Sequence, residues 1–213
     1  MLIEFNTDDK FLLKTYPPRP IKDDMPDWVN TAIDHPEQSI LRCMPAMDII
    51  NSGYIMYNSY EYRLEEKVVN FQKGLGIDSV NPRPEVLKRS TVFPALSCPG
   101  VAKNFFRIDT DWQIKTPPGY SCLIMQPFYE FNQNYQIMPA IVDTDKLDYV
   151  LNVKGYLHNT SHVMYPKDKL VQIIPFKREN WTHKTGYKKF HTHLLHYLHG
   201  AYKKLFHSNK RYD

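Results

Sequence analysis

The sequence predicts a mainly β domain with an extended N-terminal arm and a C-terminal amphipathic helix. The 213 residues contain 16 Pro but only 8 Gly, together with 15 Tyr and 11 Phe, a composition that suits short strands joined by stiff turns. Short apolar segments recur between Arg42 and Phe176 and are separated by Pro, Gly and Asp turns. Over residues 190–206, by contrast, apolar side chains gather on one face of a helical period, and Lys and His gather on the other.

These patterns divide the chain into three predicted regions. Residues 1–42 form an N-terminal strand and an extended arm, in which Tyr16–Pro20 is polyproline-like because each proline fixes φ and removes a donor. Residues 43–176 form a β-core. Residues 177–213 form a basic helix and tail.

The β-core is predicted to be a succession of strands. Alternating or continuous apolar segments indicate strands at Tyr60–Leu64, Lys67–Phe71, Asn104–Ile108, Trp112–Lys115, Tyr120–Gln126, Ile137–Val142, Tyr149–Val153 and Lys169–Phe176. The segment Thr116–Gly119 predicts a tight turn, because proline presets φ and glycine adopts positive φ without strain.

Composition also limits the compartment. Three cysteines, Cys43, Cys98 and Cys122, are an odd number without CxxC spacing, so reduced thiols are expected. No apolar segment reaches the ~18–20 residues of a membrane span. The first residues lack the pattern of a secretory signal. We expect a cytoplasmic protein, in the host cytoplasm if the protein is viral, and not a secreted one.

The positive charge is concentrated in the tail. Nine of the 27 Lys and Arg residues and two of the 23 acidic residues lie in 177–213, so the tail carries about +7 and the rest about −3. Such a helix face attracts RNA, DNA or anionic lipid, and nucleic acid is therefore one partner to test. Packing on the body or on a neighbouring subunit is the alternative. His193, His196 and His199 follow i, i+3 spacing without a carboxylate nearby, which disfavours a metal site.

Three further segments carry polar residues at turns. They are Thr116–Ser121, Ala140–Asp145 and Tyr165–Ile174. Their order and spacing resemble the dUTPase and dCTP-deaminase superfamily, in which a Pro-Gly turn opens a strand and a hairpin aspartate holds the catalytic water. Met44–Ile49 is a weaker match to the first motif of that superfamily. The resemblance covers residues 43–176 and implies a dUTPase-like (β-clip type) distorted barrel or sandwich that assembles as a homo-oligomer, specifically a trimer.

The resemblance also implies a site for nucleotide binding or hydrolysis. Asp143 would be the base that activates water, Asp145 would brace the hairpin, and Gln172 would match the glutamine of the fourth motif. If the protein is a hydrolase, it would be a nucleoside triphosphate pyrophosphatase-like enzyme that uses Mg²⁺, with Asp48 near the metal. The implied substrate-binding positions are Asp48, Lys146 and Tyr120.

Several positions depart from the superfamily pattern. Lys146 replaces the hairpin tyrosine, Ala140 replaces the opening glycine, and Gln126–Tyr129 stands where an Arg and a Ser hold phosphates. The Gly-rich motif that closes over the γ-phosphate is absent. The motifs TPPGYS, VDTD and QIIPFKRENW also resemble an uncharacterised family of phage and bacterial proteins. The alternative to a nucleotide-directed function is therefore a non-enzymatic phage assembly or interaction protein.

Overall fold

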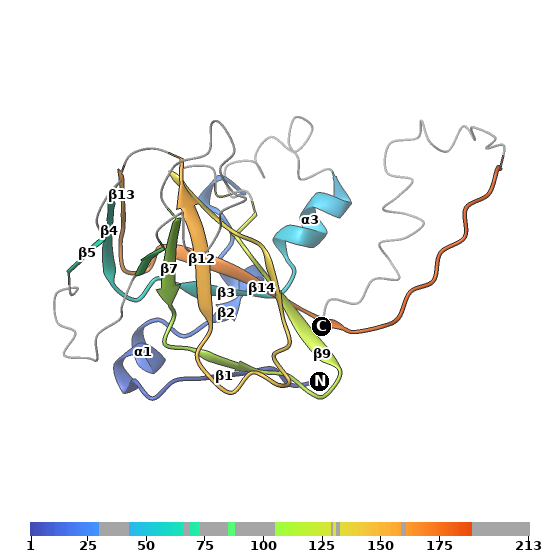
Figure 1. Cartoon of the computed structure of the whole chain (residues 1–213), viewed down its shortest axis with the longest axis horizontal. Coiled ribbons are helices and arrows are strands. Elements are labelled where there is room, and N and C mark those ends of the chain that lie inside the picture. The colour runs from blue at the N-terminus through green and yellow to red at the C-terminus, as the bar shows by residue number, and fades with distance from the viewer. Residues whose placement is uncertain are drawn as a thin grey trace. The chain divides into compact units, whose positions relative to one another are not determined.

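The computed structural model describes residues 1–29, 43–65, 69–72, 85–87, 105–128, 130, 133–158 and 161–188. The chain forms two compact units, the first of Met1–Met25 with Asn51–Arg178 and the second of Pro26–Ile50 with Glu179–Asp213. The described residues are mostly strands with a few short helices, which confirms the mainly β class (Figure 1). None of the helices among them is long and apolar enough to cross a membrane.

The strands of the first unit are antiparallel and, among the described residues, form four sheets. The two-stranded sheet pairs β1 (Glu4–Asn6) with β8 (Gln113–Lys115), and the three-stranded sheet has the order β13 (Ser161–Met164), β4 (Glu61–Glu65) and β5 (Val69–Gln72). The four-stranded sheet has the order β10 (Tyr135–Ile137), β12 (Asn152–Leu157), β7 (Phe105–Asp109) and β6 (Glu85–Leu87). The five-stranded sheet has the order β11 (Ala140–Val142), β9 (Tyr120–Met125), β14 (Lys169–Lys177), β3 (Tyr54–Tyr57) and β2 (Arg19–Pro20).

The five-stranded sheet has β14 at its centre, between β9 and β3 (Figure 1). Ile173 of β14 is paired with Ile124 of β9, and Cys122 is paired with Val142 of β11. Cys122, Ile124 and Ile173 are almost completely buried and belong to the hydrophobic core. Because side chains alternate along a strand, Ser121 and Leu123 point to the opposite face from this core.

The four-stranded sheet supplies the other side of the core. Phe106 and Tyr135 pack edge to face, with ring centroids 6.1 Å apart. Gly155 of β12 is paired with Phe106, and a Cβ at position 155 would be 2.5 Å from the Phe106 ring and 2.6 Å from the Gln136 carbonyl oxygen. A side chain at position 155 would therefore force β12 away from its neighbours.

Two short helices lie where the sequence predicted arm, strand and turn. Helix α1 (Lys10–Thr15) begins at Asp9, whose carboxylate accepts hydrogen bonds from the Phe11 and Leu12 amides at 2.7 and 3.2 Å. Helix α3 (Met44–Ile50) belongs to the second unit and has Pro45 in its first turn. Proline is tolerated there because the amides of the first turn have no partner within the helix. A single 3-10 turn, η1 (Ile21–Asp23), follows β2 in the chain.

The C-terminal helix predicted over residues 190–206 lies outside the described residues. The described part of the tail, 179–188, has neither helix nor strand. The predicted region boundaries at residues 42 and 176 remain expectations.

Candidate functional site

The turn between β11 and β12 carries the two aspartates that the motif singled out. The Asp143 carbonyl accepts the amides of Lys146 and Leu147 at 2.9 and 3.0 Å, which closes the turn over residues 143–147. Thr144, fully buried, points inward, and its hydroxyl lies 2.7 Å from that of Thr116. The buried Thr144 therefore anchors the turn to the core. The side chains of Asp143 and Asp145, on either side of it, make other contacts.

A second turn, over Pro117–Gly119, lies against the first. Gly119 has φ +87, a conformation that glycine adopts without strain, and this confirms the predicted use of its positive φ. Its amide donates to Oδ2 of Asp145 at 2.9 Å. The TPPG turn and the aspartate hairpin are thus joined by a direct backbone-to-carboxylate bond.

Arg178 holds both turns together. Its Nη1 donates to Oδ1 of Asp145 at 2.9 Å, and its Nη2 donates to the other carboxylate oxygen of Asp145. Nη1 also reaches the Ser121 hydroxyl at 2.9 Å and the Tyr120 carbonyl at 3.1 Å. The backbone amide of Arg178 donates to the Gly119 carbonyl at 2.8 Å. This bidentate pairing makes Arg178 the centre of the polar cluster.

The sequence motif ending in Trp181 contains Arg178, but we did not predict a site role for it. The pairing of Lys177 with Tyr120, two residues that are far apart in sequence, brings Arg178 to the hairpin. A basic residue just past the end of a predicted core strand was the only local signal.

Asp143 is the more accessible of the two aspartates. Its side chain is 48% exposed, whereas that of Asp145 is 7% exposed. Oδ1 of Asp143 accepts from the Ser121 hydroxyl at 2.7 Å and lies 3.1 Å from Nη1 of Arg178. The Ser121 hydrogen bond, followed by the charge of Arg178, lowers the pKa of Asp143. Pairing with Arg178 and the Gly119 amide lowers the pKa of Asp145 further. Both carboxylates are therefore ionised at neutral pH.

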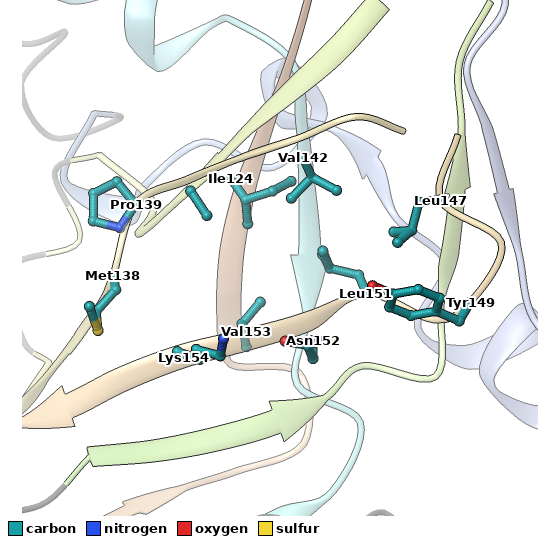
Figure 2. Close-up of a pocket in the computed structure, with 11 residues that line it drawn as sticks. Ile124, Met138, Pro139, Val142, Leu147, Tyr149, Leu151, Asn152, Val153 and Lys154 are labelled. Carbon is teal, nitrogen blue, oxygen red and sulfur yellow. The ribbon is translucent and has the colours of Figure 1, made fainter. Parts of the chain in front are cut away.

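An apolar pocket of about 360 Å³ opens between β11 and β12, on the face of β9 opposite to Ser121 (Figure 2). Its walls come from β9, β11, β12 and the chain before and after β11. Figure 2 shows Ile124 and Val142 on one side of the pocket and Leu151 and Val153 on the other. The lining residues are Ile124, Met138, Pro139, Ala140, Val142, Leu147, Tyr149, Leu151, Asn152, Val153 and Lys154.

The pocket exists because β11 and β12 belong to different sheets. β11 pairs with β9, whereas β12 pairs with β10 and β7. The two strands therefore diverge after the Asp143 turn, and the space between them is lined by both arms of the hairpin. Val142 and Leu147, which line the pocket, lie on either side of the turn that carries Asp143 and Asp145.

The other predicted site residues are placed differently. Lys146 is exposed, and its charge contributes to lowering the pKa of Asp143 and Asp145. Tyr120 contributes its carbonyl to Arg178. Asp48 lies on α3, which belongs to the second unit, whereas the cluster belongs to the first.

Gln172 does not join the Asp143 cluster. It is fully buried; its side-chain oxygen accepts from the Phe128 amide at 3.2 Å, and its side-chain nitrogen donates to the Ser52 carbonyl at 2.8 Å. It is paired with Met125, whereas Phe176, four residues further along β14, is paired with Ser121 beside Asp143. At a strand rise of about 3.3 Å, this separates Gln172 from the level of Ser121 by about 13 Å. Its bonds give it a packing role in the sheet.

The described residues do not fit a protein-held Mg²⁺ site. Among them, no three His, Cys, Asp or Glu side chains converge in a way that would hold a metal ion. Asp143 and Asp145 are both engaged by Arg178, a cation that competes with a metal for the same oxygens.

The solved structures that are similar to this chain include two dUTPases. The chain is similar to the native dUTPase of EIAV, with 11% identity and a TM-score of 0.39 over 66% of this chain and 87% of that one. It is also similar to a mutant dUTPase from phage phi11 of S. aureus, with 12% identity and a TM-score of 0.38 over 67% and 86% of the two chains. Similarity at this level does not establish a shared function. No family model and no curated protein matches the sequence.

Proposed function

We propose that the chain binds a nucleotide-type ligand at the β11–β12 hairpin, with the heterocyclic base in the apolar pocket. The observation that carries this proposal is the apolar pocket between the diverging strands β11 and β12. Val142 and Leu147 line the pocket, and Asp143 and Asp145 lie between them in the chain. The motif resemblance at Ala140–Asp145 independently points to the same hairpin.

The pocket has the chemistry that a planar base requires. Its walls are mostly aliphatic, and a base presents two apolar faces to such walls. Polar groups lie at the margin, where Asn152 and Lys154 also line the space. In the described part of the chain β11 pairs with β9 on one side only, so backbone groups on its other side are available to the edge of a base.

The pKa of Asp143 is not tuned for strong general-base catalysis. A base works best when its pKa lies near the working pH. Ser121 and Arg178 move the pKa of Asp143 in the opposite direction. We therefore expect binding with slow or absent hydrolysis, and pyrophosphate release with and without Mg²⁺ measures this directly.

The test is calorimetric titration and thermal shift of the full chain with a panel of nucleosides and nucleotides. Ala140→Phe places a ring into the pocket from the exposed edge strand. Ile141→Phe is the matched control, because Ile141 is its immediate neighbour, is 68% exposed and does not line the pocket. We expect wild type and Ile141→Phe to bind and Ala140→Phe to lose binding. Binding by none of the three proteins, or equal binding by all three, would refute the proposal.

The tail supports a second candidate function, the binding of single-stranded nucleic acid. Trp181 and Tyr187 are 87% and 96% exposed, and Lys184 and Lys188 lie between and after them. Exposed aromatic rings interleaved with cations stack on successive bases while the cations contact phosphates. The test is the salt dependence of oligonucleotide binding by the full chain and by a Trp181→Ala/Tyr187→Ala variant. Unchanged affinity in that variant would reject this role.

A further inference from the structure

We propose that Tyr149 stacks on the ligand in the hairpin pocket, so that the pocket selects planar aromatic rings over saturated rings of the same outline. The inference rests on the proposed function and goes beyond it by naming the residue that determines specificity and the kind of ring that fits. The exposure of Tyr149, the walls of the pocket and the anchored chain on either side of this residue carry it.

Tyr149 is the most exposed aromatic residue among those described in the first unit. Its exposed fraction is 63%, against 55% for Tyr165 and 39% for Phe11, the other exposed aromatic residues of that part of the chain. Unlike a ring scattered on the surface, it lines the pocket. A flat ligand that enters the pocket and covers Tyr149 therefore removes apolar ring surface from water.

The remaining walls of the pocket are mostly aliphatic, and its inner part is fixed. Tyr149 is the one aromatic side chain among the described residues that line it. Ile124, Leu151 and Val153 are at most 3% exposed and belong to the hydrophobic core. In Figure 2 Tyr149 lies at the end of the pocket opposite to Met138. A flat ring would thus meet immobile aliphatic side chains inside the pocket and a π face at its rim.

The backbone that carries Tyr149 is anchored on both sides. Two residues before it, the Leu147 amide donates to the Asp143 carbonyl at 3.0 Å, and two residues after it, the Leu151 amide donates to the Trp112 carbonyl at 2.7 Å. The ring therefore moves mainly by rotation about its own two side-chain torsions. A tyrosine on a fixed backbone loses little conformational freedom when a ligand orders it, which favours its use as a contact residue.

Stacking requires a property of the ligand that apolar contact alone does not. Aromatic rings attract one another in offset-stacked or edge-to-face arrangements, and every nucleobase offers a π face. The 5,6-dihydro form of a pyrimidine keeps the carbonyl and imide groups of the base but has a puckered, saturated ring. A pocket that only buries apolar surface would bind both forms alike, whereas a stacking pocket would prefer the planar one.

The experiment is calorimetric titration of the full chain with uridine, thymidine, their 5,6-dihydro forms, deoxyadenosine and deoxyguanosine. We expect planar pyrimidine nucleosides to bind at least about fivefold tighter than their dihydro forms to the wild type and to Tyr149→Phe. Tyr149→Ala should weaken binding of any planar nucleoside about tenfold and remove the preference. Val150→Ala is the matched control, because Val150 is the adjacent residue, is 38% exposed and does not line the pocket.

A second readout separates stacking from a merely structural role of Tyr149. The ring current of Tyr149 should shift the base protons of the bound nucleoside upfield in NMR spectra of the wild type and Val150→Ala, but not of Tyr149→Ala. Equal affinity for planar and dihydro forms, or planar binding that Tyr149→Ala leaves unchanged, overturns this inference and leaves the proposed function standing. If only purine nucleosides bind, the Tyr149 variants decide in the same way. If no nucleoside binds, the proposed function and this inference both fail.

Discussion

Asp111 lies in the turn between β7 and β8 and should destabilise the fold at neutral pH. Burial, together with the charges of Asp109, Asp8 and Asp9, raises its pKa from 3.8 to about 6, and a Tyr60 hydroxyl opposes this rise. Its Oδ2 is buried without a partner among the described residues. Its φ of +59 is a conformation that Asn also tolerates. Replacing Asp111 with Asn therefore removes the charge and keeps the backbone.

The magnitude follows from the pKa difference. At about 1.4 kcal/mol per pKa unit, a rise from 3.8 to about 6 corresponds to about 3 kcal/mol. Partial solvent exposure screens the interaction, so we expect about 1–2 kcal/mol. Because the folded state holds the proton to higher pH, the wild type loses this stability as pH rises from about 4 through 6, and the loss is complete above that range.

The assay is denaturant unfolding of Asp111→Asn and wild type from pH 4 to pH 8. The variant should be more stable by about 1–2 kcal/mol at pH 8, and the difference should shrink toward zero near pH 4. Asp148→Asn, at a carboxylate that is 86% exposed, is the control and should show little difference at either pH. A difference that is independent of pH, or a less stable Asp111→Asn at pH 8, would refute the reasoning.

Three further changes test the site and the core. Ser121→Ala removes the hydrogen bond to Asp143, so the pKa of Asp143 should rise toward its ordinary value in a carboxyl NMR titration. An unchanged pKa would show that Arg178 alone lowers the pKa of Asp143. Gly155→Ala should destabilise the chain by about 1–3 kcal/mol because a Cβ meets the Phe106 ring at 2.5 Å, and an unchanged melting temperature would contradict that clash. Gln172→Leu removes the hydrogen bonds to the Phe128 amide and the Ser52 carbonyl and should cost about 1–3 kcal/mol in urea unfolding, whereas unaltered stability would argue against its packing role.

The strands near the site could be predicted because their patterns are local. The apolar segment from Tyr120 and the turn over Thr116–Gly119 each follow from adjacent residues. Helix α1 was missed although Asp9 provides a capping signal, because the cap is followed by only six helical residues. Pro45 interrupts an apolar segment, a pattern that does not by itself predict a helix, yet it occupies the first turn of α3.

The site itself depends on contacts between distant segments. Asp143 and Asp145 were found by their motif, but their partner Arg178 is brought to them only by the pairing of β14 with β9. Gln172 matched a motif, yet whether it faces the hairpin depends on Phe128 and Ser52, which fix its side chain. The pocket could not be predicted at all, because it arises from the division of one hairpin between two sheets.

Backbone chemical-shift mapping of the full chain with a thymidine, deoxycytidine and deoxyuridine series tests the hairpin site most directly. The proposal predicts dose-dependent shifts for at least one nucleoside, centred on Ala140–Val142 and Asn152–Lys154, the strands that line the pocket. The absence of shifts at these strands up to millimolar ligand, or shifts confined to the tail residues 179–188, would contradict it.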